Sequence, residues 1–188
     1  MKKLLIAAAL WAVAPALGAS SGQAQEPAGS DAPEYAAGEK KADDKKWDVA
    51  APPLTLRQVS IDVDEGTWMN LDVSPDGRTI AFDLLGDIYT LPIGGGAATR
   101  IAAGLPFEMQ PKFSPDGTRI AFTSDRGGGD NIWIMNRDGS DVRQVTKESF
   151  RLITTPAWSP DGMYIAARKH FTTARSLGTG EIWLYHLG

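Results

Sequence analysis

The chain has 188 residues, of which 19 are basic and 23 acidic, so its formal net charge is −4 at pH 7. Since it is mildly acidic and has no basic cluster, we expect no nucleic-acid partner. It contains no cysteine, which excludes disulfides, thiolate metal sites and cysteine nucleophiles.

Residues 1–24 have the pattern of a secretory signal peptide. Lys2 and Lys3 precede an apolar segment, Leu4–Leu17, which small residues follow. We therefore expect an exported protein, periplasmic or extracellular. The apolar segment contains Pro15 and is too short for about 30 Å of hydrocarbon, so we expect no membrane span after signal cleavage.

Residues 25–53 are rich in proline, alanine, glycine and charged residues and poor in aliphatic ones. Such a segment cannot bury enough apolar surface to offset the entropy lost on ordering, so we predict a flexible linker. Residues 54–188 remain for the folded part, which is enough for one modest core.

The folded part contains an internal repeat marked by the tetrapeptide SPDG, at 74–77, 114–117 and 159–162. Each copy is followed by a run of alternating apolar residues and then by a second run with a central aromatic residue, as in "DIYTLP", "NIWIMN" and "EIWLYH". Short runs rich in β-branched and aromatic residues, repeated every 40 to 45 residues, are typical of the blades of a β-propeller.

We predict an all-β fold of antiparallel four-stranded propeller blades, with about 2.75 blades plus a closing strand. The blades span about 67–102, 108–146 and 154–188. The predicted strands are 67–73, 78–83, 87–91 and 97–102, then 108–113, 119–123, 131–136 and 142–146, then 154–158, 163–168 and 181–186.

The predicted closing strand is Leu56–Ser60, whose sequence LRQVS matches VRQVT at Val142–Thr146, the fourth strand of the second blade. No blade precedes it, and a terminal strand of this kind closes a propeller by completing the last blade. Known propellers have about four to eight blades, so three do not close. Two explanations stay open: the sequence is the N-terminal part of a longer protein, or the chain closes by oligomerising.

The SPDG tetrapeptides predict tight turns between the first two strands of each blade. Serine caps the turn, proline presets φ, aspartate suits the third position and glycine accepts a positive φ. Each copy brings a single carboxylate on its own turn, so we interpret these residues as structural. They are Ser74, Pro75, Asp76, Gly77, Ser114, Pro115, Asp116, Gly117, Ser159, Pro160, Asp161 and Gly162.

The loops at the other end of the blades are less regular, and irregular loops on a rigid scaffold often bind ligands. The longest is the predicted loop 169–180. The candidate binding residues in these loops are Asp125, Arg126, Lys169, His170 and Arg175; the alternative is that the loops are simply solvated. The only two histidines lie apart in the predicted fold, so we predict no catalytic, cofactor or metal site in this chain.

The strings "SPDGTRIAF" and "SDRGGGDNIWIMNRDGSDVRQVT" resemble the TolB-like propeller repeat, which also occurs in tricorn-type and prolyl-oligopeptidase-type propellers. Longer strings, such as "DEGTWMNLDVSPDG" and "ARKHFTTARSLGTGEIWLYH", resemble the N-terminal propeller of exported bacterial amidohydrolases. That resemblance implies a non-catalytic propeller segment serving substrate access or domain binding, with a metal only in a downstream catalytic domain.

Two other functions stay open. A TolB-like interaction module of the cell envelope would bind an envelope protein through the loops. The propeller of a prolyl-oligopeptidase-type serine peptidase would instead accompany a catalytic domain. The expected partner is accordingly a downstream catalytic domain or an envelope protein, and whether the whole protein is an enzyme stays undecided at this stage.

Overall fold

The computed structural model describes residues 48–149, 151–173 and 176–188. The predicted signal peptide, most of the predicted linker and Arg175 lie outside the described residues. Within the described part of the chain, no helix is long and apolar enough to cross a membrane.

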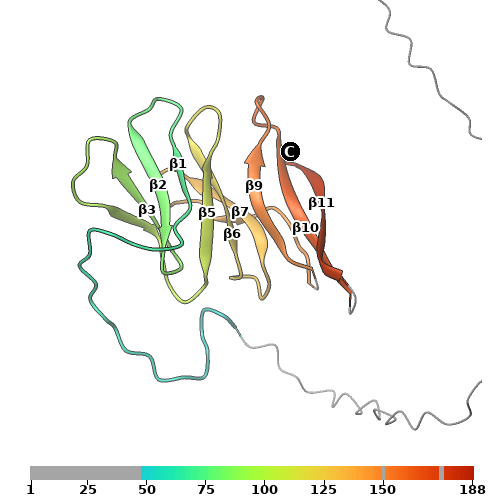
Figure 1. Ribbon diagram of the computed structural model, residues 1–188, viewed down its shortest axis with the longest axis horizontal. Helices are drawn as coiled ribbons and strands as arrows, with labels where there is room; N and C mark the ends of the chain where they lie inside the picture. The colour runs from blue at the N-terminus through green and yellow to red at the C-terminus, as the bar shows by residue number, and fades with distance from the viewer. Residues whose placement is uncertain (1–47, 150, 174–175) are drawn as a thin grey trace, which may run out of the picture. The chain divides into compact units, whose positions relative to one another are not determined.

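The described residues form three antiparallel sheets, which confirms the all-β prediction (Figure 1). Each sheet is one propeller blade, and neighbours in sequence are hydrogen-bonded neighbours in the sheet. Blade 1 is β1 (Leu71–Val73), β2 (Thr79–Leu84), β3 (Asp87–Pro92) and β4 (Thr99–Ala102); blade 2 is β5 (Glu108–Phe113), β6 (Arg119–Ser124), β7 (Asn131–Asn136) and β8 (Arg143–Gln144); blade 3 is β9 (Ile153–Trp158), β10 (Tyr164–Thr173) and β11 (Ser176–His186).

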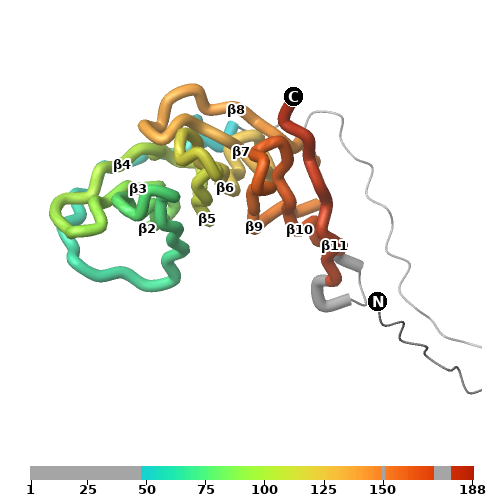
Figure 2. Tube along the Cα trace, turned by 90° about the horizontal axis from the view of Figure 1, so that it is seen from above, coloured from blue at the N-terminus to red at the C-terminus, as the bar shows by residue number. Residues whose placement is uncertain are grey.

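The blades stand face to face in an arc, with β5 and β9 on its inner side and β4 and β8 on its outer side (Figure 2). Strand β5 contacts β1, β2 and β3 of blade 1, and β9 contacts β5, β6 and β7 of blade 2. Blade 2 is therefore covered on both faces.

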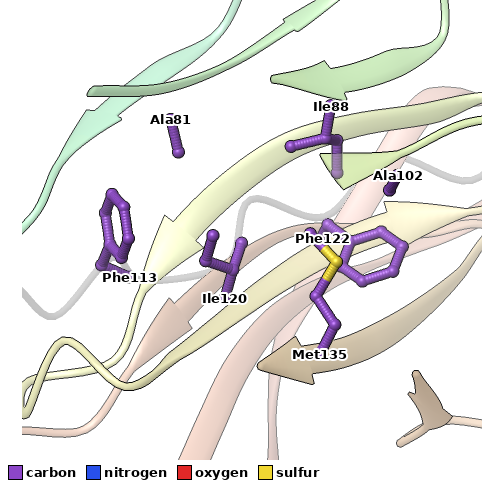
Figure 3. Packing of buried hydrophobic residues seen from close by; sticks show 7 residues of the cluster. All are labelled: Ala81, Ile88, Ala102, Phe113, Ile120, Phe122 and Met135. Carbon is purple, nitrogen blue, oxygen red and sulfur yellow. The ribbon is translucent and has the colours of Figure 1, made fainter. Parts of the chain in front are cut away.

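Two apolar clusters hold the blades together. Between blades 1 and 2 lie Ala81, Ile88, Ala102, Phe113, Ile120, Phe122 and Met135 (Figure 3). Between blades 2 and 3 lie Ala121, Ile132, Ile134, Ile153, Ile165 and Ala167. Because side chains alternate between the faces of a strand, the run Ile120-Ala121-Phe122 supplies both clusters. Each fully buried Ile or Phe contributes about 1.5–3 kcal/mol to this packing.

Hydrogen bonds also join the inner strands. The Asp83 carboxylate accepts the backbone N–H of Asn70 in its own blade at 2.8 Å and that of Gln110 in blade 2 at 2.6 Å. The Gln110 side-chain oxygen in turn accepts the backbone N–H of Thr155 in blade 3 at 2.7 Å. Gln110 and Thr155 both have a φ of 59°, and each lies where the register of its strand shifts. These bulges turn the N–H groups toward the preceding blade.

Residues 56–60, the predicted closing strand, are exposed and have no regular secondary structure in this chain. A strand forms only where a sheet edge pairs with its backbone groups, so the closing strand stays a prediction. The predicted first strand, 67–73, is likewise shortened to Leu71–Val73, since Trp68 has a positive φ and points into solvent.

The predicted loop 169–180 is also wrong over its described residues, because β10 extends to Thr173 and β11 begins at Ser176. Lys169 pairs with Glu181, His170 with Gly180 and Phe171 with Thr179. Aromatic and β-branched residues favour extended backbone, and cross-strand pairing satisfies their N–H and C=O groups. Lys169 and His170 are thus strand residues and not loop residues.

Candidate functional site

The two ends of the blades differ in chemistry. We call the end that carries the turns 74–77, 114–117 and 159–162 the SPDG end, and the opposite end, with the β2–β3 and β6–β7 connections and the connectors between blades, the loop end. The turns between the third and fourth strands lie at the SPDG end. The β2–β3 connection is a two-residue turn, in which Leu85 and Gly86 have positive φ.

Each SPDG sequence is a closed hydrogen-bonded turn. The N–H of Gly77, with φ +67°, donates to the carbonyl of Ser74 at 2.8 Å, and the other two copies repeat this bond. The Ser74 hydroxyl donates to the Asp76 carboxylate at 2.5 Å and accepts from the N–H of Thr79 at 3.0 Å. The aspartate therefore closes its own turn.

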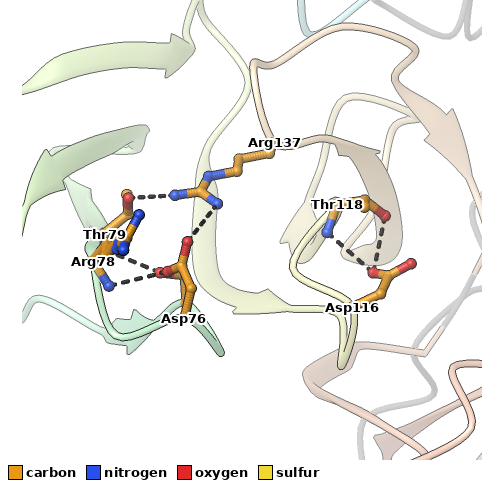
Figure 4. A network of polar contacts seen from close by, with 7 residues as sticks. Asp76, Arg78, Thr79, Asp116, Thr118 and Arg137 are labelled. Atoms are coloured by element: carbon orange, nitrogen blue, oxygen red, sulfur yellow. Dashed lines mark hydrogen bonds and ion pairs between the residues drawn. The ribbon is translucent and has the colours of Figure 1, made fainter.

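These bonds keep the three aspartates ionised. Hydrogen bonds from the serine hydroxyl, and then from the backbone N–H two residues on, lower the pKa of Asp76 and Asp161. For Asp116 the Ser114 hydroxyl, the Thr118 N–H and the Thr118 hydroxyl lower the pKa to about 2 (Figure 4). A carboxylate already committed to its own turn is a poor general acid or metal ligand.

Arg137, in the turn between β7 and β8, reaches back to blade 1 at the SPDG end (Figure 4). Its guanidinium donates to the Asp76 carboxylate at 3.4 Å and to the Thr79 hydroxyl. A shallow pocket of about 250 Å³ adjoins it, lined by Thr79, Thr90, Leu91, Pro92, Thr99 and Arg137. Typical ligand pockets begin at about 300 Å³, and Asp76 already neutralises the only cation in the lining.

At the loop end, the half-buried Arg126 of the β6–β7 connection packs against blade 2. Its guanidinium pairs with the carboxylate of Glu108, which is fully buried at the start of β5. The same guanidinium lies 5.4 Å from the centre of the Trp133 ring. Burial lowers the pKa of Arg126. The structure thus places this candidate binding residue in a packing role.

Asp125 fixes the connector between blades 1 and 2, since its carboxylate accepts the N–H of Phe107 at 2.8 Å. The Phe107 ring packs on Gly86, where an added Cβ would lie 2.8 Å from the ring carbon Cδ2. The N–H of Glu108 donates to the Gly86 carbonyl at 2.9 Å. Phe107 is therefore presented by a rigid backbone.

The two described candidates of blade 3 also contact protein groups. Lys169 is buried, pairs with Glu148 and has its Nζ 4.1 Å from the centre of the Trp183 ring. His170 is half-buried, with Nε2 at 3.1 Å from the Thr154 hydroxyl. Asp125 and Arg126 share the β6–β7 connection, while Lys169 and His170 lie on β10 of the next blade. That these residues form a binding rim stays a prediction.

The fold and the end-to-end geometry agree with the match of residues 67–183 to the family described as the tricorn protease N-terminal beta propeller domain. The chain belongs to this family. The prediction of a TolB-like and tricorn-like propeller is thereby confirmed.

Two curated relatives of this tricorn-type propeller show the extent of the similarity. The chain is 30% identical over 92 residues to Tricorn protease homolog 1 of Streptomyces coelicolor, covering 49% of this chain and 9% of that protein. It is 33% identical over 99 residues to the Tol-Pal system protein TolB of Francisella tularensis, covering 50% and 22%. The chain thus spans less than a third of the length of these curated relatives.

Solved structures give the same result. A candidate TolB from Agrobacterium tumefaciens superposes with a TM-score of 0.51 at 30% identity, covering 61% of this chain and 42% of that one. TolB from Acinetobacter baumannii superposes at 0.52 with 23% identity, covering 66% and 33%, and shares the fold. None of these relatives is named an amidohydrolase, so the amidohydrolase parent stays a prediction.

The tricorn-type propeller exposes large apolar side chains at its loop end. None of them is among the site residues predicted from the sequence, which are all polar or charged. Five connector residues share this property: Trp68, Leu85, Leu105, Phe107 and Leu152, exposed by 98%, 73%, 41%, 52% and 47%. The sequence signal was present, since large apolar residues in connectors of a β-fold have no core to enter. Among the described residues no group of three or more His, Asp or Glu could hold a metal ion.

Proposed function

We propose that this tricorn- and TolB-type propeller segment is a binding module that holds a protein partner on its loop end. The observation that carries the proposal is the set of exposed apolar connector residues at that end, Trp68 and Leu85 above all. Exposed apolar side chains gathered on one surface mark interaction sites, and Trp, Phe and Leu anchors on a fixed backbone lose little entropy on binding.

The polar groups of the SPDG end are already bonded within the protein, which favours the loop end as the binding surface. Its aspartates are committed to their own turns, and Arg137 is held by Asp76 and Thr79. At the loop end the backbone beneath Phe107 is fixed by Asp125, so the anchor is pre-formed. A pre-formed anchor binds more tightly because less ordering accompanies association.

Two observations support a compartment for the module and its partner. Residues 1–24 have the pattern of an export signal, and one relative is named a Tol-Pal system protein. We therefore place the module outside the cytoplasm, with an envelope protein as its partner. Binding of this kind requires no cofactor.

A second candidate is the propeller of a larger peptidase, in which the loop end meets a catalytic domain. The family description and the 30% identity to Tricorn protease homolog 1 favour it. In that case the partner of the loop end is a domain of the same protein. The amidohydrolase parent would use the loop end in the same way.

The experiment compares the two ends of the blades. A photo-crosslinking residue is placed at Leu85, at the loop end, and at Met163, an exposed apolar residue directly after the SPDG turn of blade 3. A protein captured at Leu85 is purified, and its Kd is measured for the wild type, W68S, L85S and the control M163S. We expect W68S and L85S to weaken binding by roughly tenfold or more each, about 1.4 kcal/mol per tenfold, and M163S to leave it unchanged.

Two outcomes would contradict the proposal. One is capture at Met163 and not at Leu85. The other is a Kd that W68S and L85S leave unchanged. Capture of a peptidase or hydrolase domain at Leu85 would favour the second candidate function.

A further inference from the structure

The chain contains four Asp-Gly pairs, at 76–77, 116–117, 138–139 and 161–162, and three of them belong to the SPDG turns. An aspartate followed by glycine is prone to rearrange to isoaspartate, because glycine has no side chain to obstruct the approach of its own nitrogen. The aspartates of the three SPDG turns are exposed to water. These pairs are therefore candidate sites of a covalent modification.

The rearrangement has two steps. The main-chain nitrogen of the glycine attacks the side-chain carboxyl carbon of the aspartate, so that a C–N bond forms, a C–O bond breaks, and the amide proton leaves with the carboxyl hydroxyl as water. Water then adds to the main-chain carbonyl of the resulting succinimide and opens the ring to isoaspartate, with no net change of atoms. The first step needs a protonated carboxyl group and a glycine nitrogen that can turn toward it.

Each SPDG turn holds the glycine nitrogen away from the carboxyl group. The N–H of Gly77 donates to the Ser74 carbonyl at 2.8 Å, and the N–H groups of Gly117 and Gly162 donate to the serine carbonyls of their own turns at 2.8 and 2.9 Å. The three glycines have φ values of +67°, +69° and +68°. Attack on the side chain would first have to break this hydrogen bond and turn the peptide group.

Each turn also keeps the carboxyl group ionised and fixed in place. The serine hydroxyl donates to it at 2.5 Å in all three turns. The backbone N–H two residues after the aspartate donates to the same oxygen at 3.0, 3.0 and 2.9 Å. These bonds lower the pKa of the three aspartates, so the protonated form that could lose water is rare near neutral pH.

The three turns differ in the donors that would remain without the serine hydroxyl. All three would keep the backbone N–H two residues on. Asp116 would also keep the Thr118 hydroxyl at 2.9 Å, and Asp76 the Arg137 guanidinium at 3.4 Å. Among the described residues, no further donor is bonded to Asp161. The turn of blade 3 therefore depends most on its serine.

We propose that the SPDG turns protect their Asp-Gly pairs from succinimide formation, and that the hydroxyls of Ser74, Ser114 and Ser159 are the protecting groups. Asp161 is then the pair that rearranges fastest when its serine hydroxyl is lost. This role of the SPDG end is separate from partner binding at the loop end.

The protection preserves the strand register next to each turn. Isoaspartate carries the main chain through its side chain, so the turn gains a backbone atom and the paired strands shift. In blade 2 the shift would act on Phe113 and Ile120, which pair directly beside the turn and are buried between blades 1 and 2. Rearrangement of a single aspartate would therefore disturb the packing between blades.

The first test compares the folded and unfolded states of the full chain. The chain is kept near neutral pH in buffer or in concentrated guanidinium chloride, and isoaspartate at each pair is quantified by peptide mapping with mass spectrometry. The three SPDG pairs share the sequence Pro-Asp-Gly and should rearrange at similar rates when unfolded. We expect rates lower by roughly tenfold or more in the folded chain. Equal rates in the two states would overturn the proposal.

The second test removes the serine hydroxyls one at a time in the folded chain. S159A should raise the rate at Asp161 roughly tenfold, because one of the two hydrogen bonds to its carboxylate is lost. S114A should raise the rate at Asp116 by less, about threefold, since the Thr118 hydroxyl still donates. The control S159T keeps a hydroxyl and should leave the rate at Asp161 close to that of the wild type.

The pattern over the three pairs separates protection by the serine from a general loss of stability. We expect S159A to leave the rates at Asp76 and Asp116 unchanged. An equal rise at all three pairs would mean that opening of the whole fold exposes them, and it would overturn the role of the serine. An unchanged rate at Asp161 in S159A would overturn it as well.

Discussion

The third strands of blades 2 and 3 have similar sequences, yet their side chains differ in burial. Their third strands read NIWI and EIWL, and both place a tryptophan at the centre. In blade 2 the flanking Ile132 and Ile134 are buried against blade 3, while in blade 3 Ile182 and Leu184 are exposed. The repeat sequence therefore places apolar side chains on a blade face, and whether they are buried depends on whether another blade packs against that face.

The same two blades each hold a cation over that tryptophan. Arg126 lies over Trp133 and pairs with fully buried Glu108, whereas Lys169 lies over Trp183 and pairs with Glu148, whose side chain is 26% exposed. The two pairs therefore differ in which member water reaches: Glu108 is fully buried while Arg126 is partly exposed, whereas Lys169 is the more buried member of its pair and Glu148 has water beside it.

The largest expected effect comes from removing Arg126, the cation whose partner carboxylate is fully buried. R126A leaves the Glu108 carboxylate buried without a partner, which we expect to cost about 3–5 kcal/mol in the free energy of unfolding. K169A should cost about 1–3 kcal/mol, because water can reach Glu148. Urea unfolding followed by circular dichroism measures both values.

The matched control replaces both members of the buried pair by an apolar residue of similar length. E108M/R126M should recover most of the stability that R126A loses, because no uncompensated charge remains. Equal losses for R126A and K169A would contradict the difference in shielding between the two blades.

The next prediction compares the buried face of blade 2 with the exposed face of blade 3. I132A removes a buried side chain between blades 2 and 3, and we expect a loss of about 2–4 kcal/mol in the free energy of unfolding. I182A should change it by no more than about 0.5 kcal/mol, since the Ile182 side chain is 71% exposed. Urea unfolding followed by circular dichroism checks this. A loss for I182A as large as that for I132A would contradict the difference in burial between the two faces.

The smallest effect concerns the SPDG turns. The folded pKa values of Asp76, Asp116 and Asp161 lie below the ordinary value of 3.8, so their stabilising contribution is complete above that pH. It is lost as the pH falls through the folded values, about 2 for Asp116. The Asp116 carboxylate accepts a bond from the Thr118 hydroxyl, whereas in blade 3 Met163 holds the equivalent position and supplies only its N–H.

Removing the Thr118 hydroxyl should give Asp116 the same hydrogen-bond donors as Asp161 has in blade 3. We expect T118A to raise the pKa of Asp116 from about 2 toward that of Asp161, and to leave the pKa of Asp161 unchanged. Carboxyl carbon chemical shifts followed by NMR from pH 6 to pH 1.5 report both groups. An unchanged Asp116 would mean that the serine and backbone bonds alone set its pKa.

Much of the fold could be predicted because the repeat encodes local geometry. The strands β3, β5 and β7 lie within a residue of their predicted bounds, since alternating apolar residues between turn residues specify an extended segment. The strands 163–168 and 181–186 were predicted, but their extension to Thr173 and back from Ser176 was not, because charged and small residues there gave no alternating apolar pattern. Lys169, a predicted loop residue, is a buried strand residue paired with Glu148.

The sequence by itself determined the strands, the SPDG turns and the alternation that gives each blade two apolar faces, because these depend on neighbours a few residues apart. Only the tertiary structure decided that Arg126 pairs with buried Glu108, that Ile132 is covered and Ile182 is exposed, and that residues 56–60 have no regular secondary structure in this chain. The physical reason is that burial and ion pairing depend on which blade stands opposite, and that neighbour lies some forty residues away along the chain.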